Sequence, residues 1–180
     1  MESNQQKRAW LKELHKHPAA RHHQEACIFT DIVGFGLARQ AQCKTHERLC
    51  SIPVEGPQIV HCGFSCKSLS TSNAYKSQFT SCLQNATGST GSTFHGLLNY
   101  TKFAEPPILI MENVVDILSE KSNNNEVLVS SFERLGYVVR PAQPVSEVCV
   151  LYLVSKHYEA ACCWQLLRLL AILRAQRPAA

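Results

Sequence analysis

The chain has 180 residues, of which 45% are hydrophobic and 18% are charged, and its formal net charge is +4 at pH 7. This composition excludes a disordered chain, and the length suits one domain with a core better than two. The weakly basic balance permits a nucleic-acid partner but is too small to predict one by itself.

The nine cysteines are an odd number. The opening residues, Met-Glu-Ser-Asn-Gln-Gln-Lys, lack the apolar segment of a secretory signal. The longest apolar stretch, residues 160–173, is interrupted by Gln165 and Arg168 and is too short to span a bilayer. We therefore expect an intracellular protein, nuclear or cytoplasmic, with reduced thiols and no membrane association.

The pattern along the chain alternates between helical and extended segments. Residues 4–16 predict a helix whose face includes Ala9, Trp10, Leu11 and Leu14, and Pro18 ends it. Short apolar runs at 27–29, 58–62 and 107–111 predict buried strands. A helix is expected between the asparagines at 123–125 and Gly136, followed by strands at 137–139 and 148–154. The result is an α/β fold with a mostly parallel sheet.

Residues 68–92 are rich in Ser, Thr, Asn and Gly and predict a long mobile loop. Three polar groups follow the predicted strands directly: Asp31, residues 63–66, and Glu112 with Asn113. In an open α/β sheet, ligands bind at the carboxyl edge of the strands, so these groups predict one site at that edge.

Cys66 lies in a glycine-containing turn after a strand, where backbone N–H groups and the adjacent Lys67 favour a thiolate. Glu112 ends an apolar strand and can act as an acid or hydrogen-bond donor if burial keeps it protonated. The alternatives are a buried structural cysteine and a solvated glutamate.

These two segments resemble motifs of the C5-cytosine methyltransferases. Residues 63–70, Gly-Phe-Ser-Cys-Lys-Ser-Leu-Ser, are similar to the family's Gly-Pro-Pro-Cys-Gln-x-Phe-Ser loop, and residues 112–114 repeat its Glu-Asn-Val motif without change. Residues 91–94 resemble the segment ahead of that motif, with the same order and spacing.

The resemblance implies a Rossmann-like fold of the S-adenosylmethionine-dependent methyltransferases, incomplete at its N-terminal strand and covering residues 1–156. It implies a catalytic set of Cys66, Glu112 and Asn113, and a cofactor-binding set of Glu2, Asp31, Ile32 and Gly63. In the family's mechanism, the cysteine attacks C6 of a cytosine that has left the DNA duplex, while the glutamate contacts N3.

Two departures keep other functions open. The family's glycine-rich cofactor loop would precede Glu2, and residues 145–154 contain no arginine where the family has a Gln-x-Arg-x-Arg strand. The alternatives to a DNA methyltransferase are an RNA cytosine methyltransferase of the same family and a non-catalytic fragment or paralogue that acts by binding.

Two further features stand outside this resemblance. We predict no metal site, because Cys43, His46 and Cys50, with His22 or His23 as a fourth ligand, form only a weak zinc pattern. Residues 157–180 predict a separate amphipathic helix or tail that covers the sheet or binds a protein partner.

Overall fold

The computed structural model describes residues 5–16, 27–53, 59–70, 72–119, 121–141 and 148–156. Glu2, His22, His23 and the tail at 157–180 lie outside these ranges, so the predictions made for them stay predictions. Within the described ranges, no helix is long and apolar enough to cross a membrane.

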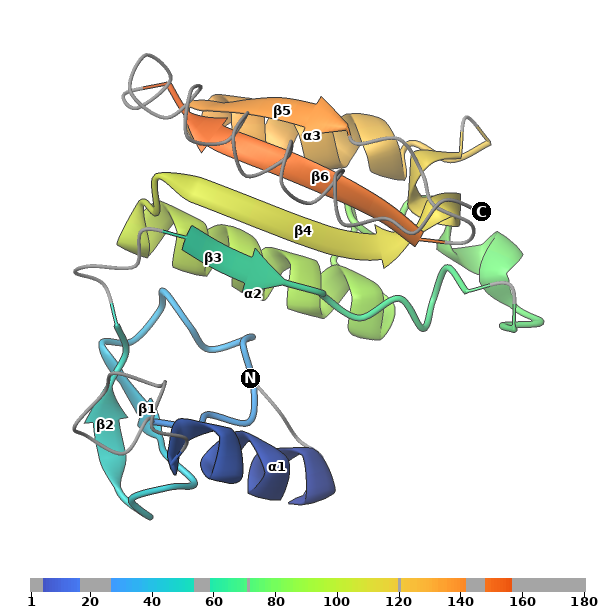
Figure 1. Ribbon diagram of the computed structural model, residues 1–180. Coiled ribbons are helices and arrows are strands. Elements are labelled where there is room, and N and C mark those ends of the chain that lie inside the picture. The colour runs from blue at the N-terminus through green and yellow to red at the C-terminus, as the bar shows by residue number, and fades with distance from the viewer. Residues whose placement is uncertain are drawn as a thin grey trace, which may run out of the picture.

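A four-stranded sheet forms the centre of the molecule (Figure 1), and its strand order is β3-β4-β6-β5. The strands are β3 (Ile59–Cys62), β4 (Ile108–Val114), β5 (Tyr137–Pro141) and β6 (Val148–Ser155). All four were predicted from the sequence. The prediction of a mostly parallel sheet is wrong, because only β3 and β4 pair in parallel, and β6 is antiparallel to both β4 and β5. The segment between the end of β5 at Pro141 and the start of β6 at Val148 is too short for the crossover that parallel strands need.

Two helices cover one face of this sheet (Figure 1). They are α2 (Gly88–Ala104) and α3 (Asn124–Arg134), and the ring centroids of Phe94 and Phe132 lie 6.2 Å apart in an edge-to-face arrangement. Their apolar side chains bury Leu109, Met111 and Leu153 of the sheet, which are at most 1% exposed. The main core therefore lies between the sheet and these two helices.

The loop predicted at 68–92 is wrong in two places. A short 3-10 helix, η1 (Lys76–Phe79), interrupts it, and α2 begins at Gly88, so residues 88–92 are helical. Thr90, Phe94, Leu97 and Thr101 are buried at intervals of four, three and four residues, which is the spacing of one helix face. The helix ends where Glu105 takes a left-handed conformation with φ of 43°, just before Pro106.

The helix predicted after the three asparagines is confirmed, and Gly136 follows its end with φ of 85°. The role of the asparagines differs from the prediction. Asn123 is the N-cap residue but its side chain makes no capping bond. The buried Asn124 instead accepts a hydrogen bond from the Leu83 backbone at 3.1 Å and donates one to the Phe79 carbonyl at 3.2 Å. A second 3-10 helix, η2 (Val115–Leu118), connects β4 to this region.

The N-terminal part contains α1 (Gln5–Lys16) and a hairpin of β1 (Gln40–Gln42) and β2 (Leu49–Ser51). Residues 27–29 were predicted to be a strand, which is wrong: only Phe29 makes an isolated antiparallel bridge, with Cys43. Trp10, placed on the predicted apolar face of α1, is 62% exposed. A small second core of Phe29, Phe35, Cys43 and Ile52 packs against Tyr100 of α2.

Candidate functional site

The Cys66 loop leaves the carboxyl end of β3 and folds into a tight turn. The backbone carbonyl of Cys66 accepts hydrogen bonds from the N–H groups of both Leu69 and Ser70 at 2.9 Å. The Cys66 side chain is half-buried, whereas Phe64 and Leu69 on either side of it are anchored in the main core. The turn therefore holds the thiol at the surface of the sheet edge on a fixed backbone.

Hydroxyl groups in the first turns of α2 hold this loop in place. Thr93 Oγ1 accepts from the Ser65 N–H at 3.1 Å, and Thr90 Oγ1 accepts from the Ser68 N–H at 3.0 Å. The hydroxyls of Ser65 and Ser89 form a third bond, at 3.0 Å. The Ser/Thr-rich sequence that suggested a mobile loop instead supplies the acceptors that the Cys66 loop needs.

Glu112 and Asn113 lie within β4, since the strand continues to Val114, and not after its end as predicted. Because side chains alternate along a strand, the two residues point to opposite faces. Asn113 is buried, and its amide donates to the Phe64 carbonyl at 3.2 Å. This bond ties β4 directly to the Cys66 loop. The parallel pairing of Cys62 with Met111 places the two motifs at the same edge of the sheet.

The Glu112 carboxylate faces His61 of β3, with 3.3 Å between Oε1 and Nε2. The Glu112 side chain is 50% exposed and that of His61 is 58% exposed. The acid role predicted for Glu112 requires burial, and the structure does not show that burial. His61 was missed by sequence reasoning. The available signal was the strand period of two, since His61 pairs with Ile110 and shares a face with Glu112.

A pocket of about 280 Å³ lies on the other side of β3 from β4. Its walls include Ile32, Phe35, Val60, Leu97 and Tyr100. This mostly apolar, aromatic lining fits a flat heteroaromatic group such as an adenine ring. Ile32 lines this pocket, and its predicted cofactor role stays a prediction.

The other two described residues of the predicted cofactor set do not line this pocket. Asp31 is exposed, and its Oδ1 accepts from the Val33 N–H at 2.9 Å. Gly63 lies at the end of β3, where an added Cβ would lie 3.6 Å from the Glu112 carbonyl oxygen. That is an ordinary contact distance, so the space around Gly63 does not by itself require a glycine.

A second pocket, of about 380 Å³, is lined by Leu69, Thr80, Asp116 and Lys121 together with serine hydroxyls. Neither Cys66 nor Glu112 lines it, so we do not assign the cysteine chemistry to this larger pocket.

The weak zinc pattern from the sequence is brought together in space. Cys43, His46 and Cys50 converge, and the fourth group is Cys27, in place of the predicted His22 or His23. Sequence reasoning missed Cys27, because it lies sixteen residues before Cys43 and reaches it only through the bridge between Phe29 and Cys43.

A cysteine loop and a Glu-Asn-Val strand on adjacent parallel strands, backed by helices, define a mixed α/β domain of the methyltransferase type. The family model of the C-5 cytosine-specific DNA methylase matches residues 38–148, which is more than half of the chain. The chain therefore belongs to the C-5 cytosine-specific DNA methylase family, as the motifs predicted. Members of this family use S-adenosylmethionine as the methyl donor. No curated protein matches the chain.

Proposed function

We propose that this chain transfers a methyl group from S-adenosylmethionine to C5 of cytosine in DNA, with Cys66 as the nucleophile. The observation that carries the proposal is the link between the two motifs. The parallel pairing of β3 with β4, together with the bond from Asn113 to the Phe64 carbonyl, holds the Cys66 loop and Glu112 at one sheet edge.

Cys66 Sγ, as the thiolate, forms a bond to C6 of the cytosine, and the electron pair of the C5–C6 double bond moves toward C5 and N3. C5 would then attack the methyl carbon of the bound donor, whose S–CH3 bond breaks to leave S-adenosylhomocysteine. Loss of the C5 proton to a base and breaking of the S–C6 bond restore the double bond and release the thiolate. The base must leave the duplex stack for Cys66 to reach C6.

Glu112 would contact N3, where negative charge develops, and would supply a proton there once the flipped-out base shields the half-exposed carboxyl group from water. His61 orients the Glu112 carboxylate through their 3.3 Å contact and is therefore a positioning residue. Asn113 fixes the distance between strand and loop and keeps Glu112 and Cys66 in a constant relation.

The pocket that includes Ile32 would hold the adenosyl part of the donor, which supplies an electrophilic methyl group when bound. Its apolar walls would pack against the adenine ring and exclude water from it. Asp31 stands next to Ile32 and can accept from a polar group at the rim. Gly63 keeps the β3 turn free of a side chain at this end of the sheet.

The test is methyl transfer from radiolabelled S-adenosylmethionine to cytosine-containing DNA by the full chain. Cys66→Ala is expected to abolish transfer, whereas Cys66→Ser and Glu112→Gln should lower it by at least about a hundredfold. A covalent adduct with DNA containing 5-fluorocytosine, which has no C5 proton to lose, would identify the attacking residue by mass spectrometry. Unchanged turnover in Cys66→Ala would refute the mechanism.

Two alternatives are outcomes of the same experiment. Transfer to tRNA but not to DNA would identify an RNA cytosine methyltransferase with the same residues. Transfer to neither, with calorimetry showing no binding of S-adenosylmethionine, would indicate a non-catalytic fragment or paralogue. Asp31→Asn tests in calorimetry whether the Asp31 charge contributes to binding of S-adenosylmethionine. The substitution keeps the oxygen that accepts from the Val33 N–H and removes only the charge, so weaker binding would support the cofactor role of Asp31.

A further inference from the structure

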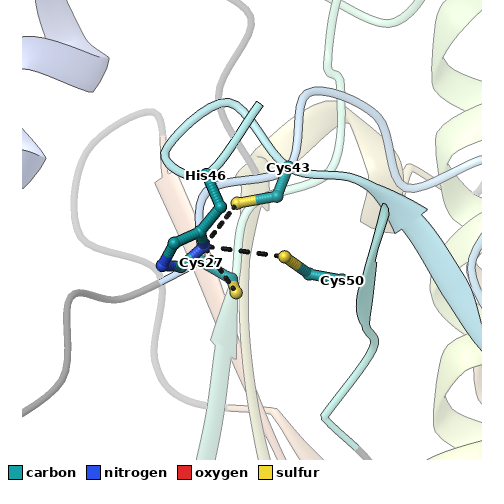
Figure 2. Close-up of side chains that lie close together, drawn as sticks. All are labelled: Cys27, Cys43, His46 and Cys50. Carbon is teal, nitrogen blue, oxygen red and sulfur yellow. Dashed lines mark hydrogen bonds between the residues drawn. The ribbon is translucent and has the colours of Figure 1, made fainter. Parts of the chain in front are cut away.

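Three cysteine sulfurs and one histidine nitrogen converge on one point beside the β1–β2 hairpin (Figure 2). His46 Nδ1 lies 3.4 Å from Cys43 Sγ and 3.5 Å from the Sγ atoms of both Cys27 and Cys50. All four potential ligand atoms lie within 4.8 Å of one another. The four side chains come from three separate segments: the residues before Phe29, the hairpin turn, and β2.

Hydrogen bonding does not explain this convergence. The Nδ1 atom of an imidazole carries either one proton or one lone pair, so it makes one good hydrogen bond. Here three sulfurs approach the same nitrogen at nearly equal distances. A single imidazole nitrogen can form a good hydrogen bond with only one of these three sulfurs, so the bond to His46 does not account for the approach of all three.

A shared metal ion does explain the distances. With Zn–S bonds of about 2.3 Å and a Zn–N bond of about 2.0 Å, a tetrahedral centre separates nitrogen from each sulfur by about 3.5 Å. The three observed N···S distances, 3.4 to 3.5 Å, match this edge of the tetrahedron. The Cys43-x2-His46-x3-Cys50 spacing lets a single hairpin present three ligands, two from its turn and one from β2.

We infer that Cys27, Cys43, His46 and Cys50 bind one zinc ion at a structural site. Three thiolates and an imidazole are soft and borderline ligands, which select zinc over magnesium or calcium. Four protein ligands complete a tetrahedral shell and leave no open position, which is typical of structural and not catalytic zinc.

The surroundings of the site indicate what the ion stabilises. Each strand of the hairpin has only three residues, and the core beneath it has five buried residues, of which Tyr100 comes from α2. A two-stranded hairpin of this size is marginal in water without a further constraint. The ion would fasten residues 27–29 to the hairpin, and Ile28 and Phe29 form one wall of the pocket beside β3. Metal binding would therefore keep that wall in place.

The first test measures metal in the full chain, purified without an affinity tag that binds metal. Elemental analysis should find one zinc ion per chain. The reconstituted Co²⁺ form should give the intense visible bands of a tetrahedral thiolate site and a sulfur-to-metal charge-transfer band. Cys43→Ser and Cys50→Ser each remove one thiolate ligand, so each variant should show a weaker charge-transfer band and contain less than one zinc ion per chain. Cys62→Ser is the matched control, because Cys62 is a free thiol outside the cluster and should keep both signals.

The second test covers the case in which these variants fail to fold. Removal of zinc from the wild-type chain by a chelator should lower Tm and free the four ligand side chains. Added zinc should restore Tm. The same chelator should leave the Tm of Cys27→Ser/Cys50→Ser, if folded, unchanged. Folded wild-type protein without bound metal, with bound iron in place of zinc, or with a Cys43–Cys50 disulfide would each overturn the inference. None of these readouts depends on methyl transfer.

Discussion

Two thiols only four residues apart, Cys62 and Cys66, have different environments. Burial raises the pKa of the Cys62 thiol to about 12, and the negative charge of Glu112 acts in the same direction. At pH 8 about one Cys62 in ten thousand is then a thiolate, so iodoacetamide should leave it unmodified in the native protein. Both side chains are half-buried, but the Cys62 thiol lies within β3 and donates to the Ile110 carbonyl at 3.7 Å, whereas Cys66 lies in the turn that follows β3. We predict that Cys66 is alkylated well before Cys62, as measured by peptide mass spectrometry over time.

Two controls test this prediction about cysteine alkylation. In urea both cysteines should react at similar rates, since the protection of Cys62 comes from folded structure. Cys66→Ser should remove the early modification without accelerating that of Cys62. Early labelling of Cys62 in the native chain would contradict the raised pKa of its thiol.

The sequence indicated candidate residues that lie in recognisable motifs. It missed residues whose candidate role depends on contacts with distant parts of the chain. Cys66, Glu112 and Asn113 could be selected because their neighbours in sequence have a characteristic pattern. His61 and Cys27 could not, because each acquires its partner through strand pairing: His61 across β3 and β4, and Cys27 across the bridge of Phe29 with Cys43. A pairing register is a long-range property that no local spacing specifies.

Helix α2 approaches other backbone so closely at Gly91 that it requires glycine there. A Cβ on Gly91 would overlap the Cys82 carbonyl oxygen and lie 2.7 Å from the carbonyl carbon of Ala86. Glycine to alanine in a helix interior normally stabilises a protein by about 0.5–1 kcal/mol. Because backbone cannot move aside as a side chain does, we predict that Gly91→Ala reverses this sign and destabilises by about 1–3 kcal/mol. Urea unfolding measures the change.

Gly34→Ala is the matched control, because a Cβ at Gly34 meets nothing within 4 Å. Its free energy of unfolding should stay within about 0.5 kcal/mol of the wild type. A neutral Gly91→Ala would mean that α2 packs less closely against the turn at residues 82–86 than these distances require. Displacing α2 would also move Thr90 and Thr93, so the Cys66 loop depends on this packing.

Elements with a strong apolar signal were the ones that the sequence predicted. The strands β3, β4, β5 and β6 and the helix α3 were found from apolar runs and from Gly136. The helix α2 was missed because its first two turns consist of Gly, Ser and Thr, which favour loops in isolation. Its tertiary hydrogen bonds to the Cys66 loop outweigh that local preference. The β1–β2 hairpin was missed because its strands are short and half-exposed.

The described part of the molecule is held by two cores that share side chains. Ile32 and Val60 pack against both, and Tyr100 of α2 contributes to the small core while Phe94 and Leu97 of the same helix fill the large one. The Tyr100 hydroxyl also donates to the Pro53 carbonyl at 3.1 Å. The N-terminal unit is thus coupled to the sheet through α2, the same helix that anchors the Cys66 loop. We therefore expect that a change which destabilises the β1–β2 hairpin also shifts α2 and, with it, the Cys66 loop.

Alkaline pH tests the buried groups of this shared core together. Burial raises the pKa of Cys62 to about 12 from an ordinary value of 9.0, and burial also raises the pKa of Tyr137, Tyr100 and Cys82. The unfolded chain releases these protons from about pH 9 upward, while the folded chain retains them. Unfolding is therefore favoured as pH rises above 9, by up to about 1.4 kcal/mol per pH unit for each such group.

We accordingly predict a steep loss of stability between pH 9 and pH 11, measured as the free energy of unfolding in urea at each pH. Tyr137→Phe removes one titrating group and also the bond from its hydroxyl to the Pro106 carbonyl at 2.7 Å. It should be less stable at pH 7.5, by about 1 kcal/mol, yet lose stability less steeply above pH 9. Cys62→Ala should also flatten the slope. Parallel pH profiles for the wild type and both variants would mean that these groups are solvated in the folded state, and that the core between sheet and helices is looser than its burial implies.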